Sequence, residues 1–177
     1  SDESGLAIAW ALATGQEVMR FSGEGAVVGV DAIAASPDGR HVATGEFDTT
    51  VKIWDAQAVT TTAHLLLTLF GHASQVVSVA YRADGKTLAS ASEDGTIKLW
   101  DALTGRALLT LAGHTSGVLG VTFSDDGQRL YSASRDGTVR LWDVSAGAGY
   151  EAVNLVGHTD RLFSAAYSPD GRRLATW

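Results

Sequence analysis

One stretch of the sequence occurs twice with little change, and this repetition limits the folds that the chain can adopt. The segment SASEDGTIKLWD ends at Asp101, and SASRDGTVRLWD ends at Asp143. Tryptophans follow the same step of roughly 42–46 residues, at Trp10, Trp54, Trp100 and Trp142. Asp-Gly pairs keep nearly this step, at Asp38-Gly39, Asp84-Gly85, Asp126-Gly127 and Asp170-Gly171. A period of this length indicates an array of similar units rather than one irregular domain.

Each unit has the pattern of four short β-strands. In the best-preserved repeat we expect strands over 76–81, 87–92, 96–101 and 107–113, joined by turns at Asp84-Gly85, Asp94-Gly95 and Thr104-Gly105. A glycine in these pairs supplies a positive φ at low steric cost. The pattern predicts an all-β, antiparallel meander. One such sheet cannot bury both of its faces, so neighbouring sheets must stack.

Two dipeptides mark the units further. Gly-His pairs precede the first strand at Gly71-His72, Gly113-His114 and Gly157-His158. Trp-Asp pairs end the third strand at Trp54-Asp55, Trp100-Asp101 and Trp142-Asp143. In these features the chain resembles the WD-repeat β-propeller family, and the resemblance implies a propeller of four-stranded antiparallel blades. The first repeat departs from the pattern, because Ala11 follows Trp10 and Glu24 stands where the histidine would be.

The two ends of the chain look like halves of one repeat. Residues 1–24 align with the third and fourth strands of a unit, and residues 159–177 align with the first and second. We therefore expect a single domain over 1–177 with four blades, one of them split between the termini and the others at approximately 25–70, 71–112 and 113–158. The chain could close alone as a four-bladed ring, form an eight-bladed homodimer by exchanging half-blades, or be part of a longer propeller. The exchanged homodimer is the arrangement that we favour, because a two-fold axis satisfies both half-blades with identical junctions.

The resemblance also assigns a buried hydrogen-bond network to each blade. It implies two complete structural tetrads and two less regular sets. The complete tetrads are His72, Ser90, Asp94 and Trp100, and His114, Ser132, Asp136 and Trp142. The other sets are Thr44, Asp48 and Trp54, and His158, Thr176 and Trp10 across the termini, with Asp2 or Glu3 as the acid.

Serine, histidine and aspartate together could instead form a hydrolytic triad. We reject this reading, because the set recurs in every repeat, accepts threonine in place of serine and includes a tryptophan that hydrolysis does not need. No unrepeated acid, base or metal cluster stands out in the sequence, and the five histidines are far apart. We expect no enzymatic activity, no cofactor and no metal site.

Charge and hydropathy narrow the possible partners. The formal net charge is −7 and the Lys and Arg residues are scattered, so the chain has no basic stripe for nucleic acid. No apolar run approaches the roughly 18 residues that a bilayer span requires, and we expect no membrane association.

Ser1 in place of an initiator Met indicates a chain trimmed or cut from something longer. The cytoplasm is the default location, since the absence of cysteine suits any redox compartment.

A scaffold of this kind acts through its loops. The resemblance implies that protein or peptide partners bind the face formed by the loops between blades and the turns between second and third strands. The candidate partner-binding residues on that face are Phe47, Ser74, Gln75, Glu93, Ser116, Arg135, Asp160 and Arg161. We expect a non-enzymatic interaction scaffold, such as one module of a larger regulatory protein of bacterial type. The alternative is a self-assembly element whose half-blade exchange is itself the function.

Overall fold

The fold consists of antiparallel β-sheets that stack along an open arc. The computed structural model describes residues 7–11, 16–21, 29–57, 63–145, 150–156, 165–167 and 174–176. These residues form three four-stranded sheets and two two-stranded sheets. The all-β prediction is therefore confirmed for the described part of the chain.

Each four-stranded sheet is a meander in which consecutive strands pair. The first sheet contains β3 (Val30–Ala35), β4 (His41–Glu46), β5 (Val51–Asp55) and β6 (His64–Leu69). The second sheet contains β7 (Val76–Tyr81), β8 (Thr87–Ser92), β9 (Thr96–Asp101) and β10 (Ala107–Ala112). The third sheet contains β11 (Val118–Phe123), β12 (Arg129–Ser134), β13 (Thr138–Asp143) and β14 (Tyr150–Val156).

The tight turns of the second sheet follow the sequence prediction. Gly85, Gly95 and Gly105 have φ angles of 69°, 83° and 73°. These values lie in the left-handed region that glycine adopts at low cost. The strands between these turns coincide with the ranges that the repeat predicts, except that β10 ends one residue earlier.

Tryptophan packing joins each sheet to the one before it. Trp100 of β9 lies in a cluster with Val51 and Ile53 of the first sheet, and Trp142 of β13 lies in a cluster with Ile97 and Leu99 of the second. Both indoles are only 2% exposed. The stacked sheets thus bury the faces that a single meander would leave in water.

The first and second sheets lie close together at Gly45 of β4. A Cβ atom built on Gly45 would lie 2.7 Å from the backbone oxygen of Val76 and 2.9 Å from its Cγ1. No side chain fits there without moving one of the sheets. The same position is Ala91 in the second sheet and Ala133 in the third.

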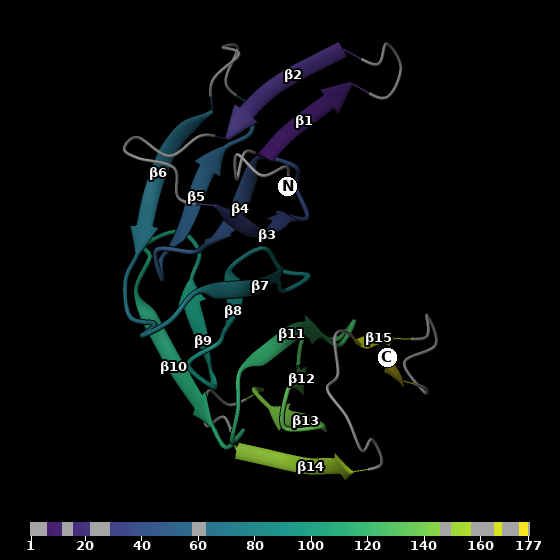
Figure 1. Ribbon diagram of the computed structural model, residues 1–177. Coiled ribbons are helices and arrows are strands. Elements are labelled where there is room, and N and C mark those ends of the chain that lie inside the picture. Colours follow the sequence, from purple (N-terminus) through teal and green to yellow (C-terminus); the bar gives the residue numbers. More distant parts are fainter. Residues whose placement is uncertain are drawn as a thin grey trace.

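A two-stranded sheet lies near each end of the arc. One consists of β1 (Ala7–Ala11) and β2 (Gln16–Phe21), and the other of β15 (Ala165–Tyr167) and β16 (Leu174–Thr176). They are separate sheets, and Figure 1 shows them at opposite ends of the arc, with the inner strands β3, β7 and β11 between them. Among the described residues, β1 and β16 thus belong to separate sheets, and a blade assembled from the two termini stays a prediction.

None of the described residues forms a helix that could span a membrane.

Candidate functional site

Backbone hydrogen bonds define two loop faces. On the face that we call the top, the amides of Phe47, Glu93 and Arg135 donate to the carbonyls of Gly29, Gln75 and Gly117. These bonds tie the turn between the second and third strands of each sheet to the loop before its first strand. On the opposite face, which we call the bottom, the amides of Ala56, Ala102 and Val144 donate to Arg40, Lys86 and Gln128.

The second sheet holds a continuous chain of side-chain hydrogen bonds. The Trp100 indole Nε1–H donates to Ser90 Oγ at 2.8 Å, and Ser90 Oγ lies 2.7 Å from His72 Nε2. His72 Nδ1 lies 2.9 Å from Asp94 Oδ2. With a neutral imidazole, Nδ1–H donates to the carboxylate and Nε2 accepts from the hydroxyl, so every donor meets an acceptor. These hydrogen bonds join the loop before β7 to strand β8, the β8–β9 turn and strand β9.

The third sheet repeats this geometry. Trp142 Nε1–H donates to Ser132 Oγ at 2.9 Å, Ser132 Oγ lies 2.7 Å from His114 Nε2, and His114 Nδ1 lies 2.9 Å from Asp136 Oδ2. Each imidazole also packs edge-on against the tryptophan of its own sheet, with ring centroids 6.3 Å and 6.2 Å apart. The structure thus brings together both complete sets that the sequence nominates.

These serines have triad-like partners but no access for a substrate. Ser90 is 0% exposed and Ser132 is 1% exposed. Each hydroxyl is also occupied by an indole N–H donor. A nucleophile must reach the scissile carbonyl, which a buried hydroxyl cannot do, so the arrangement suits strand fastening rather than hydrolysis.

In the two Gly-His pairs that the structure describes, the glycine lies against the tryptophan of its own repeat. A Cβ atom on Gly113 would lie 3.1 Å from Trp142 Cη2 and 2.7 Å from an Arg140 guanidinium nitrogen. On Gly71 it would lie 3.3 Å from Trp100 Cη2, and Gly71 has a φ of +152°. Close approach to the indole thus explains why glycine precedes the histidine.

The first sheet is fastened differently. Trp54 Nε1–H donates to Thr44 Oγ1 at 2.9 Å, and Thr44 Oγ1 donates to Glu46 Oε1 at 2.6 Å. Glu46 is 1% exposed, and its other oxygen lies 3.7 Å from Lys52 Nζ. The Thr44 hydroxyl thus donates to a buried carboxylate, whereas the Ser90 and Ser132 hydroxyls lie against an imidazole. Burial raises the pKa of Glu46, and the contacts with Thr44 and Lys52 only partly offset this effect.

Asp48 does not extend the Thr44 and Trp54 chain as we expected. Its Oδ1 accepts from the backbone and hydroxyl of Thr50, and its Oδ2 lies 3.6 Å from Lys52 Nζ. The acid that accepts from Thr44 is Glu46, which the sequence analysis did not single out. Serines occupy the position of Glu46 in the other sheets, at Ser92 and Ser134. This departure from the repeat was the sequence feature that could have identified Glu46.

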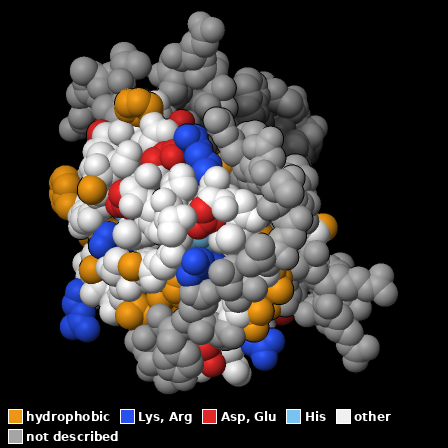
Figure 2. Space-filling view, turned by 60° about the horizontal axis from the view of Figure 1, so that its bottom comes forward, with side chains coloured by type: hydrophobic (Ala, Val, Ile, Leu, Met, Phe, Trp, Pro, Cys, Tyr) orange, Lys and Arg blue, Asp and Glu red, His pale blue; other side chains and the backbone are white. Residues whose placement is uncertain are grey.

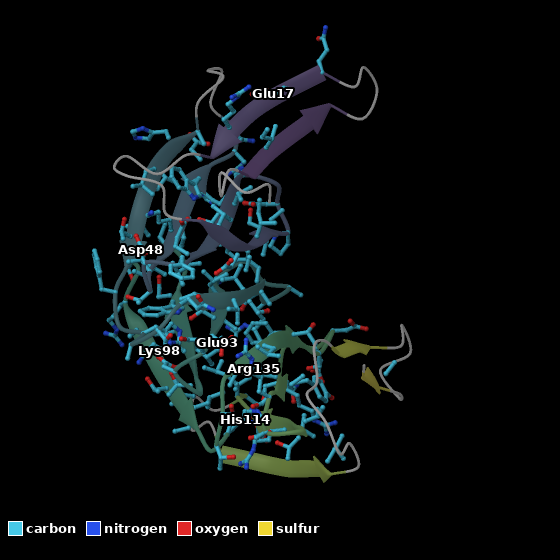
Figure 3. The ribbon with its side chains drawn as sticks, in the orientation of Figure 1. Glu17, Asp48, Glu93, Lys98, His114 and Arg135 are labelled. Atoms are coloured by element: carbon cyan, nitrogen blue, oxygen red, sulfur yellow. The ribbon has the colours of Figure 1, made fainter. Side chains whose placement is uncertain are left out.

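Two of the predicted partner-binding residues contact each other. Glu93, in the β8–β9 turn, forms an ion pair with Arg135 in the β12–β13 turn, and Figure 3 shows the two side chains close together. The Glu93 side chain is only 14% exposed, whereas that of Arg135 is 42% exposed. The pair therefore joins neighbouring sheets, and less of it faces solvent than the sequence suggested. Phe47 holds the equivalent position in the first sheet and is 62% exposed.

The other predicted partner-binding and tetrad residues are only partly described by the structure. The backbone carbonyls of Ser74 and Ser116 accept hydrogen bonds from Ser92 and Ser134, and the side chains of both are partly exposed, as is that of Gln75. His158, Asp160 and Arg161 lie outside the described residues, as do Asp2 and Glu3. The backbones of Trp10 and Thr176 are described, in β1 and β16, but their side chains are not.

Charges on the described surface are mixed. Figure 2 shows basic and acidic side chains interspersed over the described part of the face in view, rather than gathered by sign. Within the same part of the chain, no three histidine, aspartate or glutamate side chains come together as metal ligands.

Comparison with known families agrees with this geometry. The family model described as WD domain, G-beta repeat matches residues 15–55, 63–101, 105–143 and 150–176. These segments cover more than half of the chain, which belongs to the WD40 repeat family. The resemblance stated from the sequence is confirmed, and the four-stranded sheets are called blades from here on. Members of this family generally serve as protein-interaction scaffolds. No curated protein matches the chain.

Removing the central hydroxyl of a tetrad should destabilise the fold. In Ser90→Ala the Trp100 indole N–H and His72 Nε2 both lose a buried partner, so we expect the free energy of unfolding to fall by about 1–3 kcal/mol. Urea unfolding followed by tryptophan fluorescence measures this change. Ser145→Ala, which alters an exposed serine, is the control and should stay within about 0.5 kcal/mol of the parent. An unchanged midpoint for Ser90→Ala would mean that the hydrogen-bond chain contributes nothing.

Stability should depend on pH through His72. Burial lowers the pKa of His72, although the hydrogen bond to Asp94 raises it in part. The unfolded chain therefore takes up a proton first as the pH falls. The contribution of neutral His72 to the free energy of unfolding is complete above its pKa of 6.5 in the unfolded chain. This contribution is lost as the pH falls from there toward the lower pKa in the folded state.

Urea unfolding of the parent and His72→Gln at several pH values tests this expectation. The parent should lose more stability than the variant between about pH 7 and pH 5. Glu46 acts in the opposite direction, because its raised pKa lowers stability as the pH rises from 4.5 toward the folded value. That effect is common to both proteins and cancels in the comparison. Identical pH profiles for the two proteins would rule out His72 as the titrating group.

Proposed function

We propose that the chain is a non-enzymatic scaffold that binds a protein or peptide partner through its top face, with Phe47 as an anchor. The observation that carries the proposal is the exposure of this aromatic ring. At the same position the second and third blades have Glu93 and Arg135, which form an ion pair with each other. The Phe47 side chain is uncharged, so it cannot form an ion pair of this kind, and 62% of its surface faces solvent.

The surroundings of Phe47 hold its backbone in place. Its amide donates to Gly29 O at 3.0 Å, and the turn that follows is closed by Asp48, which accepts from Thr50. An aromatic side chain on a fixed backbone loses little conformational freedom on binding. Large aromatic residues of this kind frequently dominate the binding energy of protein interfaces.

A phage-displayed library of random linear peptides tests this proposal. Peptides selected on the parent chain should include a group that binds Phe47→Ala more weakly by about 2 kcal/mol or more, while the fold measured by circular dichroism is unchanged. Leu103→Ser, which alters an exposed residue of the bottom face, is the control and should leave this group bound. If every selected peptide binds Phe47→Ala as tightly as it binds the parent, Phe47 is not an anchor for peptide binding.

A second candidate function is self-assembly by exchange of half-blades. The two two-stranded sheets lie at opposite ends of the arc and do not pair with each other. Within the described residues each has an unpaired strand edge, and edges of this kind pair readily with other strands. In a symmetric homodimer, β16 of one copy would pair with β1 of the other at two identical junctions, and the ring would contain eight blades.

Solution mass across a dilution series tests half-blade exchange. The chain has a mass of 18.5 kDa, and exchange predicts a single species of twice that mass which persists on dilution, because each seam would contain a full set of strand hydrogen bonds. Light scattering coupled to gel filtration makes the measurement. A stable monomer, or a polydisperse aggregate without a dimer, would contradict this function and leave the Phe47 proposal untouched.

A further inference from the structure

A pocket of about 860 Å³ lies on the bottom face, between the first and second blades. Its walls come from the β3–β4 and β7–β8 turns, the β9–β10 turn, and the adjoining parts of β5 and β6. It is separate from the top face that contains Phe47, because the bottom-face turns connect the opposite ends of the strands. A volume of this size accommodates a short peptide segment.

The lining of the pocket is largely aliphatic. Ile53, Leu66 and Leu67 form its inner wall, and Ala102 and Leu103 contribute from the β9–β10 turn. Leu103 is 84% exposed and Leu66 is 43% exposed. An aliphatic side chain placed between these two leucines would be removed from water together with their exposed surface.

The described residues at the next junction form a smaller, polar pocket instead. The equivalent pocket between the second and third blades measures about 420 Å³ and is lined by polar residues and glycine. There Arg82 forms an ion pair with Asp84, and a Cβ atom built on Gly127 would lie 2.8 Å from Arg82 Cδ. The residue that corresponds to Arg82 at the first junction is the small Ser36, and Ser145 takes the place of Leu103 at the second. The apolar pocket therefore distinguishes the first junction from the second and does not follow from the repeat alone.

The rim of this pocket contains three carboxylates. Asp38, Asp84 and Asp101 line it together with Lys86 and His41. Asp84 is paired with Arg82. Asp38 and Asp101 each use Oδ1 to accept local hydrogen bonds.

Asp38 and Asp101 each have an arginine close enough to interact by charge, Arg40 and Arg106, respectively. Arg40 Nε approaches Asp38 Oδ2 only to 3.9 Å, and the Arg40 side chain is 66% exposed. Hydrogen bonds from Ser36 and from the Thr104 backbone lower the pKa values of Asp38 and Asp101, respectively, so both carboxyls are ionised at neutral pH.

We propose that this bottom-face pocket binds a linear peptide segment of a partner protein in which an aliphatic side chain lies next to a lysine or arginine. The aliphatic side chain enters between Leu66 and Leu103. The cationic group meets the Asp38 and Asp101 carboxylates at the rim, where charge-assisted hydrogen bonds are stronger than neutral ones. The site is independent of the top-face function, so either proposal can fail without the other.

The test uses the full chain and a phage-displayed library of random linear peptides, with counter-selection on Leu103→Ser. Serine occupies the equivalent exposed position in the third blade, so this variant is expected to fold, which circular dichroism checks. Peptides that bind the parent and lose at least about tenfold in affinity for Leu103→Ser should combine an aliphatic residue with a lysine or arginine. Synthetic copies should bind more weakly as the salt concentration rises.

Two further variants sharpen the result. Leu108→Ser removes a leucine that is 45% exposed on β10 but does not line the pocket, and it should leave the affinity within about twofold. Lys86→Gln introduces the residue found at the second junction and removes the one lysine of the lining, so it should strengthen binding. The proposal is overturned if no selected peptide distinguishes the parent from Leu103→Ser. It is also overturned if the distinguishing peptides are acidic, or if Leu108→Ser weakens binding as much as Leu103→Ser.

Discussion

The stacking of one sheet on the next depends on tryptophans that take part in two kinds of interaction at once. The ring of Trp100 packs against Val51 and Ile53 of the preceding blade, while its N–H donates to Ser90 within its own blade. The apolar contact sets the distance between blades, and the hydrogen bond fixes the rotation of the ring. The described turns on the top and bottom faces depend on this arrangement, because they extend directly from strands held in this way.

Much of this framework could be predicted from the sequence because its determinants are local and repeated. Gly85 and Gly95 define turns by their own conformational freedom, and Trp100 recurs in phase with them. The ion pair between Glu93 and Arg135 could not be predicted, because it crosses from one blade to the next and depends on the rotation between them. Glu46 was missed for another reason. A glutamate in a strand is normally predicted to be exposed. Only the structure shows that Glu46 is buried against Lys52.

The first blade shows how one fold tolerates a different chemistry at the same place. A neutral imidazole bridges the hydroxyl and the Asp94 carboxylate, which also accepts from the Ala73 and Thr96 amides, whereas Glu46 and Lys52 must offset each other's desolvation. Such a pair demands particular geometry and gains less stability than an apolar contact of equal volume. The first blade is also the one with an aromatic residue at the top and an open aliphatic pocket at the bottom. The departures from the repeat therefore coincide with the surfaces that we propose for binding.

Gly45 limits how freely the units of this chain could be recombined. The first two blades approach until a backbone oxygen of one leaves no space for a methyl group on the other. The equivalent junction between the second and third blades accommodates the methyl group of Ala91, so the two seams differ in their spacing. A unit copied from one place into another would bring its side chains but not the gap that they require. Gene duplication can produce such an array, but each copy afterwards becomes fitted to its own neighbour.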